Sequence, residues 1–174
     1  MNVKKIEPPY LIAVTGSKSE FGEHVDRIRT TASGVVVKIL NGRKMKDWPS
    51  AMDEIATELE FPAYFGKNIP ALSECLQDLE WLPGDAYLLL IYDAVSVLTK
   101  ETHSDAISFF NLLDRICREW AVGTLPGANW ERKQTPFHIL LCGDSVDIEK
   151  LTRRLEPEIS HIPVVDVSDA MRTG

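Results

Sequence analysis

Three short runs of mostly apolar residues constrain the fold more than any other feature of this chain. They occupy residues 34–40, 86–92 and 137–142 and are rich in β-branched, leucine and aromatic side chains. Helical patterns separate them, so strands alternate with helices along the chain. Strands that are apolar on both faces are typical of a parallel sheet covered by helices. The sequence therefore predicts an α/β fold with a parallel sheet of three core strands.

The helices between these runs are marked by apolar stripes and by cap residues. The first has a stripe over residues 52–59, and either Ser50, in a capping box, or Asp47 can cap its N-terminus. Ser104 can cap a long helix over residues 105–121. Apolar residues cover more than half of this long helix, so we expect it to be buried on more than one face.

Residues 61–68 predict a short loop that ends on a helix cap. Pro62 fixes an extended approach, and Gly66 can take a backbone conformation that other residues avoid. Asn68 is a strong N-cap candidate, because its side-chain oxygen can accept from a free N–H of the next turn. Pro70 suits that first turn, where its missing N–H is not needed. The helix that follows has one apolar stripe, made by Leu72, Cys75, Leu76 and Leu79.

This loop and helix resemble the signature of the barstar family, the intracellular inhibitors of barnase-like ribonucleases. The family pattern is Pro-x-Tyr-aromatic-Gly-x-Asn, followed by a helix with Ala-Leu, an acidic residue and Cys-Leu. The resemblance covers about residues 34–143 and implies the barstar-like fold, whose order of elements agrees with the order predicted from periodicity. The residues that carry it are Pro62, Tyr64, Phe65, Gly66, Asn68, Ala71, Leu72, Glu74, Cys75 and Leu76.

The resemblance implies a cytoplasmic, bacterial immunity-type protein that inhibits a basic ribonuclease or toxin protein. Acidic side chains at a helix end can enter a catalytic cleft built for phosphate and occupy its basic residues. By resemblance, Glu74 takes the place of the main anionic anchor, Tyr64 supplies a flat aromatic contact, and Gly66 lets the partner approach the backbone. We call the residues that the resemblance places against the partner the signature surface: Tyr64, Gly66, Asn68, Ile69, Ser73 and Glu74.

Four positions depart from the family pattern. Pro70 stands where an acid is usual, Ser73 where a tryptophan is common, and Arg115 where the long helix usually offers a further contacting acid. Glu74 is one methylene longer than the usual aspartate. A changed charge map acts against the original partner as much as for a new one, so we expect weak or absent inhibition of barnase. A second hypothesis also stays open, in which the chain is a barstar-fold protein-interaction module without nuclease inhibition.

The distribution of charge supports a basic partner. The chain has 26 acidic and 19 basic residues, for a net charge of −7. Between residues 47 and 80 there are eight acids and only one base, Lys67. Such a field attracts basic proteins and repels nucleic acid. The alternative is that these acids form the solvated faces of two amphipathic helices, a common arrangement that carries no functional meaning.

Other classes of function find little support in the sequence. The four histidines lie far apart, without metal-ligand spacing, and residues 15–19 lack the first glycine of a phosphate loop. Cys75, Cys117 and Cys142 are scattered within apolar patterns, as expected of buried thiols in a reducing compartment. We therefore expect no enzyme, cofactor, metal, nucleic-acid or membrane function, and rank a small-molecule enzyme last.

Pieces at both ends exceed the family core. We interpret residues 1–174 as one domain, with an N-terminal extension (1–33) and a C-terminal addition (144–174). Residues 9–14 predict a short strand, and residues 163–167 predict a last strand after a helix capped by Asp144 or Ser145. These strands are expected to extend the sheet at its edges. Residues 123–136 form a connection longer than most.

Overall fold

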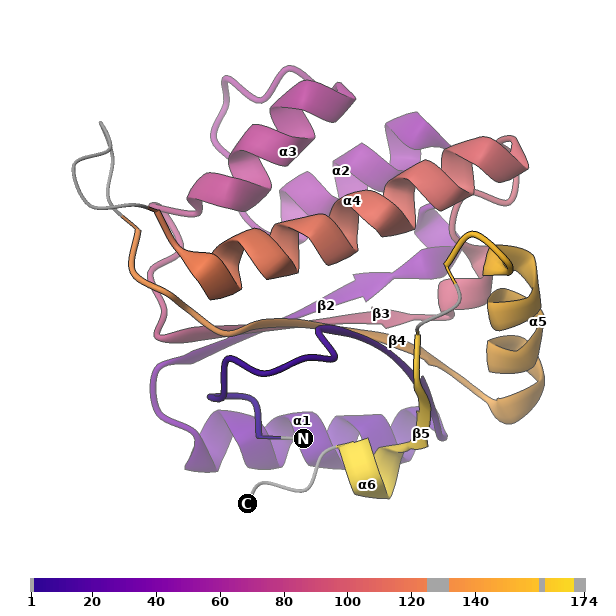
Figure 1. The fold of residues 1–174 in the computed structure, drawn as a ribbon, viewed down its shortest axis with the longest axis horizontal. Coiled ribbons are helices and arrows are strands. Elements are labelled where there is room, and N and C mark those ends of the chain that lie inside the picture. Colours follow the sequence, from indigo (N-terminus) through magenta and orange to yellow (C-terminus); the bar gives the residue numbers. More distant parts are fainter. Residues whose placement is uncertain (1, 125–131, 160–161, 171–174) are drawn as a thin grey trace.

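Five parallel strands form a single sheet in the computed structural model, which describes residues 2–124, 132–159 and 162–170. Their order across the sheet is β2-β3-β4-β1-β5, and every neighbouring pair is parallel (Figure 1). This confirms the predicted α/β class and the three predicted core strands. The strands are β1 (Leu11–Thr15), β2 (Val35–Asn41), β3 (Ala86–Tyr92), β4 (Phe137–Gly143) and β5 (Val164–Asp166).

The two terminal segments extend the sheet on one side only. β1 pairs with β4, and β5 then pairs with β1, so both added strands lie beyond β4. β2 keeps the opposite edge. The strand predicted over residues 163–167 is shorter than expected, because Val167 already begins the short helix α6 (Val167–Ala170). The added strands convert β4 from an edge strand into a central one, so its backbone is protected from pairing with other chains.

Helices cover both faces of the sheet (Figure 1). α1 (Lys18–Thr31) lies on one face, which it shares with α6. On the other face α2 (Trp48–Glu58) and α4 (His103–Val122) contact the sheet, and α3 (Ile69–Asp78) packs on α4 as the outermost element. α5 (Ser145–Leu155) packs against β1, β4 and the short helix η2 (Ala94–Ser96). Residues 61–68, which we call the signature loop, and α3 therefore lie on the outside of the helical layer.

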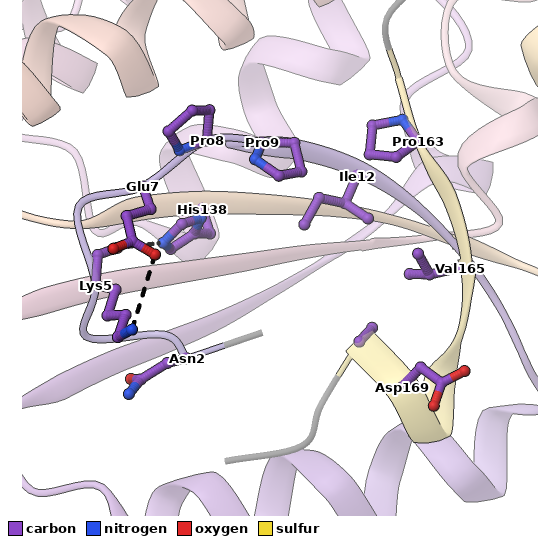
Figure 2. A pocket seen from close by; sticks show the side chains of 11 residues that line it. Asn2, Lys5, Glu7, Pro8, Pro9, Ile12, His138, Pro163, Val165 and Asp169 are labelled. Atoms are coloured by element: carbon purple, nitrogen blue, oxygen red, sulfur yellow. Dashed lines mark hydrogen bonds and ion pairs between the residues drawn. The ribbon is translucent and has the colours of Figure 1, made fainter. Parts of the chain in front are cut away.

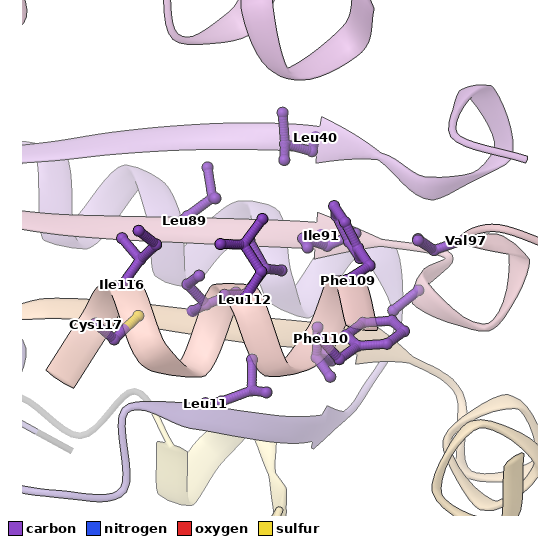
Figure 3. Packing of buried hydrophobic residues seen from close by; sticks show 14 of the residues in the cluster. Leu11, Leu40, Leu89, Ile91, Val97, Phe109, Phe110, Leu112, Ile116 and Cys117 are labelled. Atoms are coloured by element: carbon purple, nitrogen blue, oxygen red, sulfur yellow. The ribbon is translucent and has the colours of Figure 1, made fainter. Parts of the chain in front are cut away.

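The long helix α4 supplies the centre of the larger core. Figure 3 shows Phe109, Leu112 and Ile116 directed at strand residues such as Leu89 and Ile91. Nine residues of α4 are buried, which confirms that the helix is covered on more than one face. Burying side chains of this size stabilises a fold by about 1.5–3 kcal/mol each, so α4 is the platform that holds α3 in place.

One of the predicted helix caps is wrong, and two others are settled between the alternatives that the sequence offers. α2 is capped by Asp47, whose side chain accepts from the N–H of Ser50, with Ser50 completing the capping box from inside the helix. α4 is capped by Thr102 instead of Ser104, because Asp105 at the third helical position can then accept from the Thr102 N–H. Asp144 caps α5, one of the two expected alternatives. α2 and α4 each start where the cap and the third helical residue can satisfy each other's N–H groups.

Candidate functional site

The signature loop, residues 61–68, is anchored by two of its aromatic rings and projects a third. Phe61 and Phe65 meet edge to face, with ring centroids 5.0 Å apart, and Phe61 also contacts Trp81. The indole of Trp81 donates to the carbonyl of Leu59 at 2.9 Å, which ties the end of α2 to the segment after α3. Tyr64 points outward and is 74% exposed. The phenol ring of Tyr64 is therefore exposed to solvent on a loop that packed aromatic rings hold in place.

The unusual backbone conformation of this loop lies at Lys67, which was not expected from the sequence. Lys67 has a φ of 47°, whereas the expected position, Gly66, has no positive φ. A side chain at Gly66 would lie 3.1 Å from the amide nitrogen of Asn68, which donates to the Gly66 carbonyl. Gly66 therefore gives room to the Asn68 amide. The prediction that Gly66 takes an unusual backbone conformation is therefore wrong. Its missing side chain matters instead because it leaves space for a neighbouring amide.

The cap and the apolar face of α3 are as predicted. The side-chain oxygen of Asn68 accepts from the N–H of Ala71 at 2.9 Å, and Pro70 lies in the first turn. Leu72, Cys75, Leu76 and Leu79 are all buried. On the outer side of α3, Ile69 is 44% exposed and Glu74 is exposed. The Asn68 cap and the buried stripe together fix the direction in which Glu74 points.

Ser73 is the member of the signature surface that is most engaged within the chain. It is half-buried, and its hydroxyl accepts from Arg115 at 3.1 Å and from Gln77 at 3.3 Å. Arg115 also pairs with Glu119 at 2.8 Å, and Gln77 donates to Glu119 at 2.7 Å. A polar bridge therefore joins α3 to α4 beside Glu74, and it holds the guanidinium of Arg115 at the border of the signature surface.

A family model described as barstar (barnase inhibitor) matches residues 35–142. The chain belongs to the barstar family. The match covers more than half of the chain and agrees with the resemblance drawn from the loop and helix, over nearly the same residues. A comparison with curated proteins finds no match. Barstar-family members are inhibitors that bind barnase-type ribonucleases, so a protein is the kind of partner that the family membership supports.

Seven of the eight acids between residues 47 and 80 fall into two groups, and the eighth, Glu58, is half-buried without an ion pair among the described residues. Four acids between residues 47 and 60 form ion pairs with lysines from other segments, at 2.7–3.0 Å. Glu74, Asp78 and Glu80, on or directly after α3, have no ion-pair partner among the described residues. The pairs of the first group are Asp47–Lys100, Asp53–Lys67, Glu54–Lys44 and Glu60–Lys38.

Desolvation, and after it the nearby carboxylates, raise the pKa values of two groups beside α3. The pKa of Tyr64 is raised first by partial desolvation and then by the negative charges of Asp78 and Glu80. The pKa of the Cys75 thiol is raised by burial and then by Asp78 and Glu74. Both groups therefore stay neutral near pH 7, and the potential around them is negative.

A hollow on the other face of the sheet has a mainly structural histidine in its wall. Figure 2 shows one of about 270 Å³ on the α1 side of the sheet, between the N-terminal segment, Pro163 and Val165. His138 on its wall is buried, and its Nε2 lies 3.0 Å from the Lys5 carbonyl. Burial lowers the pKa of His138, so the ring is neutral at pH 7 and ties the N-terminal segment to β4. His138 is therefore a packed histidine with a structural role.

The stretch considered as a phosphate loop is the start of α1. Ser17 caps α1 and accepts from the N–H of Glu20, while the Glu20 carboxylate accepts from the Ser17 N–H. This capping box uses N–H groups that a phosphate would need. Within the described ranges no three potential ligands gather as a metal site, and none of the described helices is long and apolar enough to cross a membrane. The expectation about the 123–136 connection concerns mainly residues 125–131, which lie outside the described residues.

Proposed function

We propose that this chain binds a basic protein, a ribonuclease or toxin, through the signature surface, and masks the partner's phosphate-binding groups. The observation that carries this proposal is a 74% exposed tyrosine next to a helix face whose acids have no ion-pair partner in the part of the chain that the structure describes. Exposed aromatic rings are costly to leave in water and are enriched at the centres of protein interfaces. The proposal concerns Tyr64, Gly66, Asn68, Ile69, Ser73 and Glu74.

The proposed mechanism uses charge first and occlusion second. The negative field of Glu74, Asp78 and Glu80 steers a basic surface toward α3. On contact, the Glu74 carboxylate accepts from the cations of a cleft built for phosphate, and the ring of Tyr64 covers the neighbouring surface. Loss of water around these pairs strengthens them. Substrate is then excluded by the bound helix, without any chemical step by the inhibitor.

The partner is proposed to differ from barnase. Pro70 removes an acid from the first turn of α3, and Arg115 brings a positive charge to the edge of the surface, 3.1 Å from the Ser73 hydroxyl. Although Glu119 pairs with it, Arg115 stands where the family usually offers an acid, so this edge attracts a basic cleft less than the family pattern does. We expect the cognate partner to offer a neutral or acidic group opposite Arg115.

Affinity capture from the native cytoplasm, followed by mass spectrometry, tests the proposal. The full chain serves as bait, and the variant Glu74→Ala with Tyr64→Ala serves as the matched control, since both side chains are exposed and folding is preserved. A basic nuclease or toxin enriched by the native chain and lost with the control supports the proposal. Equal capture by both baits contradicts it.

Titration into purified barnase tests the expected change of partner. Weak or absent inhibition agrees with the effects of Pro70 and Arg115. Inhibition at nanomolar concentration would overturn the expectation.

A protein-interaction module without nuclease inhibition is the second candidate. The observation that favours it is the engagement of Ser73, whose hydroxyl is occupied by Arg115 and Gln77 within the chain. A capture dominated by proteins that are not nucleases, and that depends on Tyr64 and Glu74, would favour this candidate over inhibition.

A further inference from the structure

The two segments outside the family match enclose the hollow on the α1 side of the sheet, which has a volume of about 270 Å³. Residues 2–12 supply one part of its lining and residues 163–170 another, and His138 of β4 joins them (Figure 2). The family model matches residues 35–142. The family core therefore supplies His138, and the added segments supply the rest of the described lining.

Most of this lining is apolar. Pro8, Pro9 and Ile12 form an apolar wall from the N-terminal segment and β1. Pro163 and Val165 extend it from the segment that contains β5. A neutral, apolar molecule gains free energy when it leaves water for such walls, whereas an ion would lose its hydration. The walls therefore favour an uncharged, apolar ligand.

His138 has an acceptor that the described chain leaves unused. Its side chain is 1% exposed, and its Nε2 donates to the Lys5 carbonyl, since a carbonyl oxygen can only accept. In the neutral ring Nδ1 then carries a lone pair, and this buried atom has no hydrogen-bond partner among the described residues. Pro8 and Pro9 have no N–H to offer it. A buried acceptor without a donor is costly, so a ligand that brings a donor gains from this contact.

The size and polarity of the hollow define the class of ligand. Sites for drug-sized ligands measure about 300–1,000 Å³, so a hollow of about 270 Å³ suits a smaller molecule. The charges of Lys5 and Glu7 are mostly exposed and lie 3.9 Å apart, so they compensate each other at the rim. A small neutral aromatic ring with one N–H or O–H combines an apolar body with a single donor.

We propose that this hollow binds a small neutral aromatic molecule, whose ring packs on the proline and aliphatic walls and whose N–H or O–H donates to Nδ1 of His138. Because Nδ1 is shielded from solvent, we expect the segment before β1 to move slightly when the ligand engages it. The signature loop and α3 lie on the opposite face of the sheet (Figure 1). The inference therefore goes beyond the proposed function and does not depend on it.

The test uses indole as the probe and the ¹⁵N-labelled full chain as the receptor. Saturable amide shift changes are expected at Ile12, Val165 and Ala170, together with a change of the His138 Nδ1 resonance that reports an accepted hydrogen bond. 1-Methylindole has nearly the same shape but no N–H, so it is expected to bind about tenfold more weakly and to leave the Nδ1 resonance unchanged. Equal binding of the two probes, or no saturable response to indole, would overturn the proposal.

A bound water that serves as the donor is the alternative outcome. Nδ1 of His138 would then report an accepted hydrogen bond before any probe is added, and its resonance would stay the same at saturating indole. That result would contradict the proposed contact.

Two variants with the same added volume locate the site. Ala170 is buried in α6 and lines the hollow, so Ala170→Leu fills part of it and is expected to abolish the response to indole. Ala63→Leu makes the same change at an exposed position of the signature loop and is expected to leave binding unchanged. Amide spectra of β3 and β4 show whether each variant keeps the fold, and the comparison of the two probes on the native chain does not depend on either variant. A folded Ala170→Leu variant that binds indole as the native chain does would place the site elsewhere and refute the inference.

Discussion

The helices α2 and α3 carry acids at similar density but use them differently. Along α2 and its flanks, Asp53 pairs with Lys67 at 2.7 Å, Glu54 with Lys44 at 3.0 Å, and Glu60 with Lys38 at 2.7 Å. On α3, Glu74 and Asp78 point to solvent and have no cation among the described residues. Most of the acidic charge of α2 and its flanks is compensated by lysines of the same chain, with Glu58 as the exception among the described pairs, and the charge of α3 remains available to a partner.

Ion pairs in the folded chain reduce the acidic surface to a smaller region than the sequence suggests. Eight acids between residues 47 and 80 oppose one base when charges are counted along the chain. Four of the eight are neutralised by lysines, three of which lie outside that stretch. The field that a partner meets is therefore centred on α3, where the exposed Tyr64 also lies.

The largest expected effect is on partner binding, and it separates the two helices. Glu74→Ala is expected to weaken binding of the captured partner by about 2–5 kcal/mol, because it removes one member of a desolvated charge pair. Asp53→Ala, a matched change on α2, is expected to cost less than about 1 kcal/mol, since Asp53 already has Lys67. Surface plasmon resonance on both variants measures the difference. Equal losses would mean that the unpaired state of Glu74 carries no functional information.

The second prediction concerns stability, for which we expect the acid on α2 to matter more than the acid on α3. Glu54 is 6% exposed, accepts from the Asn41 N–H at 3.0 Å and pairs with Lys44. Glu54→Ala leaves that N–H at the edge of β2 without its acceptor, so the free energy of unfolding is expected to fall by about 1–3 kcal/mol.

Two variants control this prediction in urea denaturation. Glu54→Gln keeps an acceptor for the Asn41 N–H and is expected to recover part of the loss. Glu74→Ala is expected to change the unfolding free energy by less than about 0.5 kcal/mol, because Glu74 is exposed and has no ion pair with any described residue. A larger loss for Glu74→Ala than for Glu54→Ala would mean that the acid on α3, and not the acid on α2, stabilises the fold.

Much of the fold follows from sequence patterns, but α1 does not stand out. Its apolar stripe is narrow, with Phe21, Val25 and Ile28 buried among many charged neighbours. The Ser17–Glu20 capping box and the spacing of these three residues were present as signals. Only one face of α1 packs on the sheet, so most of its residues are polar. The cap and the short apolar stripe therefore do not stand out in the sequence.

Parts of the candidate site depend on contacts that local sequence rules cannot include. The lysines that neutralise α2 come from β2, the signature loop and the segments around η1 (Gly42–Lys44) and η2, and only the folded chain brings them together. The positive φ falls on Lys67, and Gly66 instead leaves room for the Asn68 amide. By contrast, the Asn68 cap and the Leu72–Leu76 stripe are local features, and both were predicted correctly.

A third, smaller effect concerns the basic edge of the signature surface. Arg115→Glu restores an acid where the family usually has one, and it removes the cation beside Glu74. Binding to barnase is expected to tighten about tenfold at low ionic strength and less at high salt. Arg153→Glu makes the same charge change on α5, where Arg153 likewise pairs with a glutamate four residues away. If Arg153→Glu improves binding equally, net charge is responsible and Arg115 has no special place.

The smallest expected effect is the acid limit of stability, which tests whether the α2 acids are engaged. The pKa of Asp47 is lowered to about 2, first by hydrogen bonds from Ser50 and then by Lys100. Because the native pKa lies below the unfolded value of 3.8, Asp47 contributes stability that is complete well above pH 3.8 and is lost as the pH falls toward 2. Asp47→Asn retains a good N-cap residue but no titratable group. The native chain is therefore expected to be more stable than Asp47→Asn at pH 6, and the difference should shrink steadily below pH 4 in urea denaturation. A difference that stays constant down to pH 2 would show that the Asp47 carboxylate is not engaged in the folded state, and the contrast between α2 and α3 would lose one of its four supporting pairs.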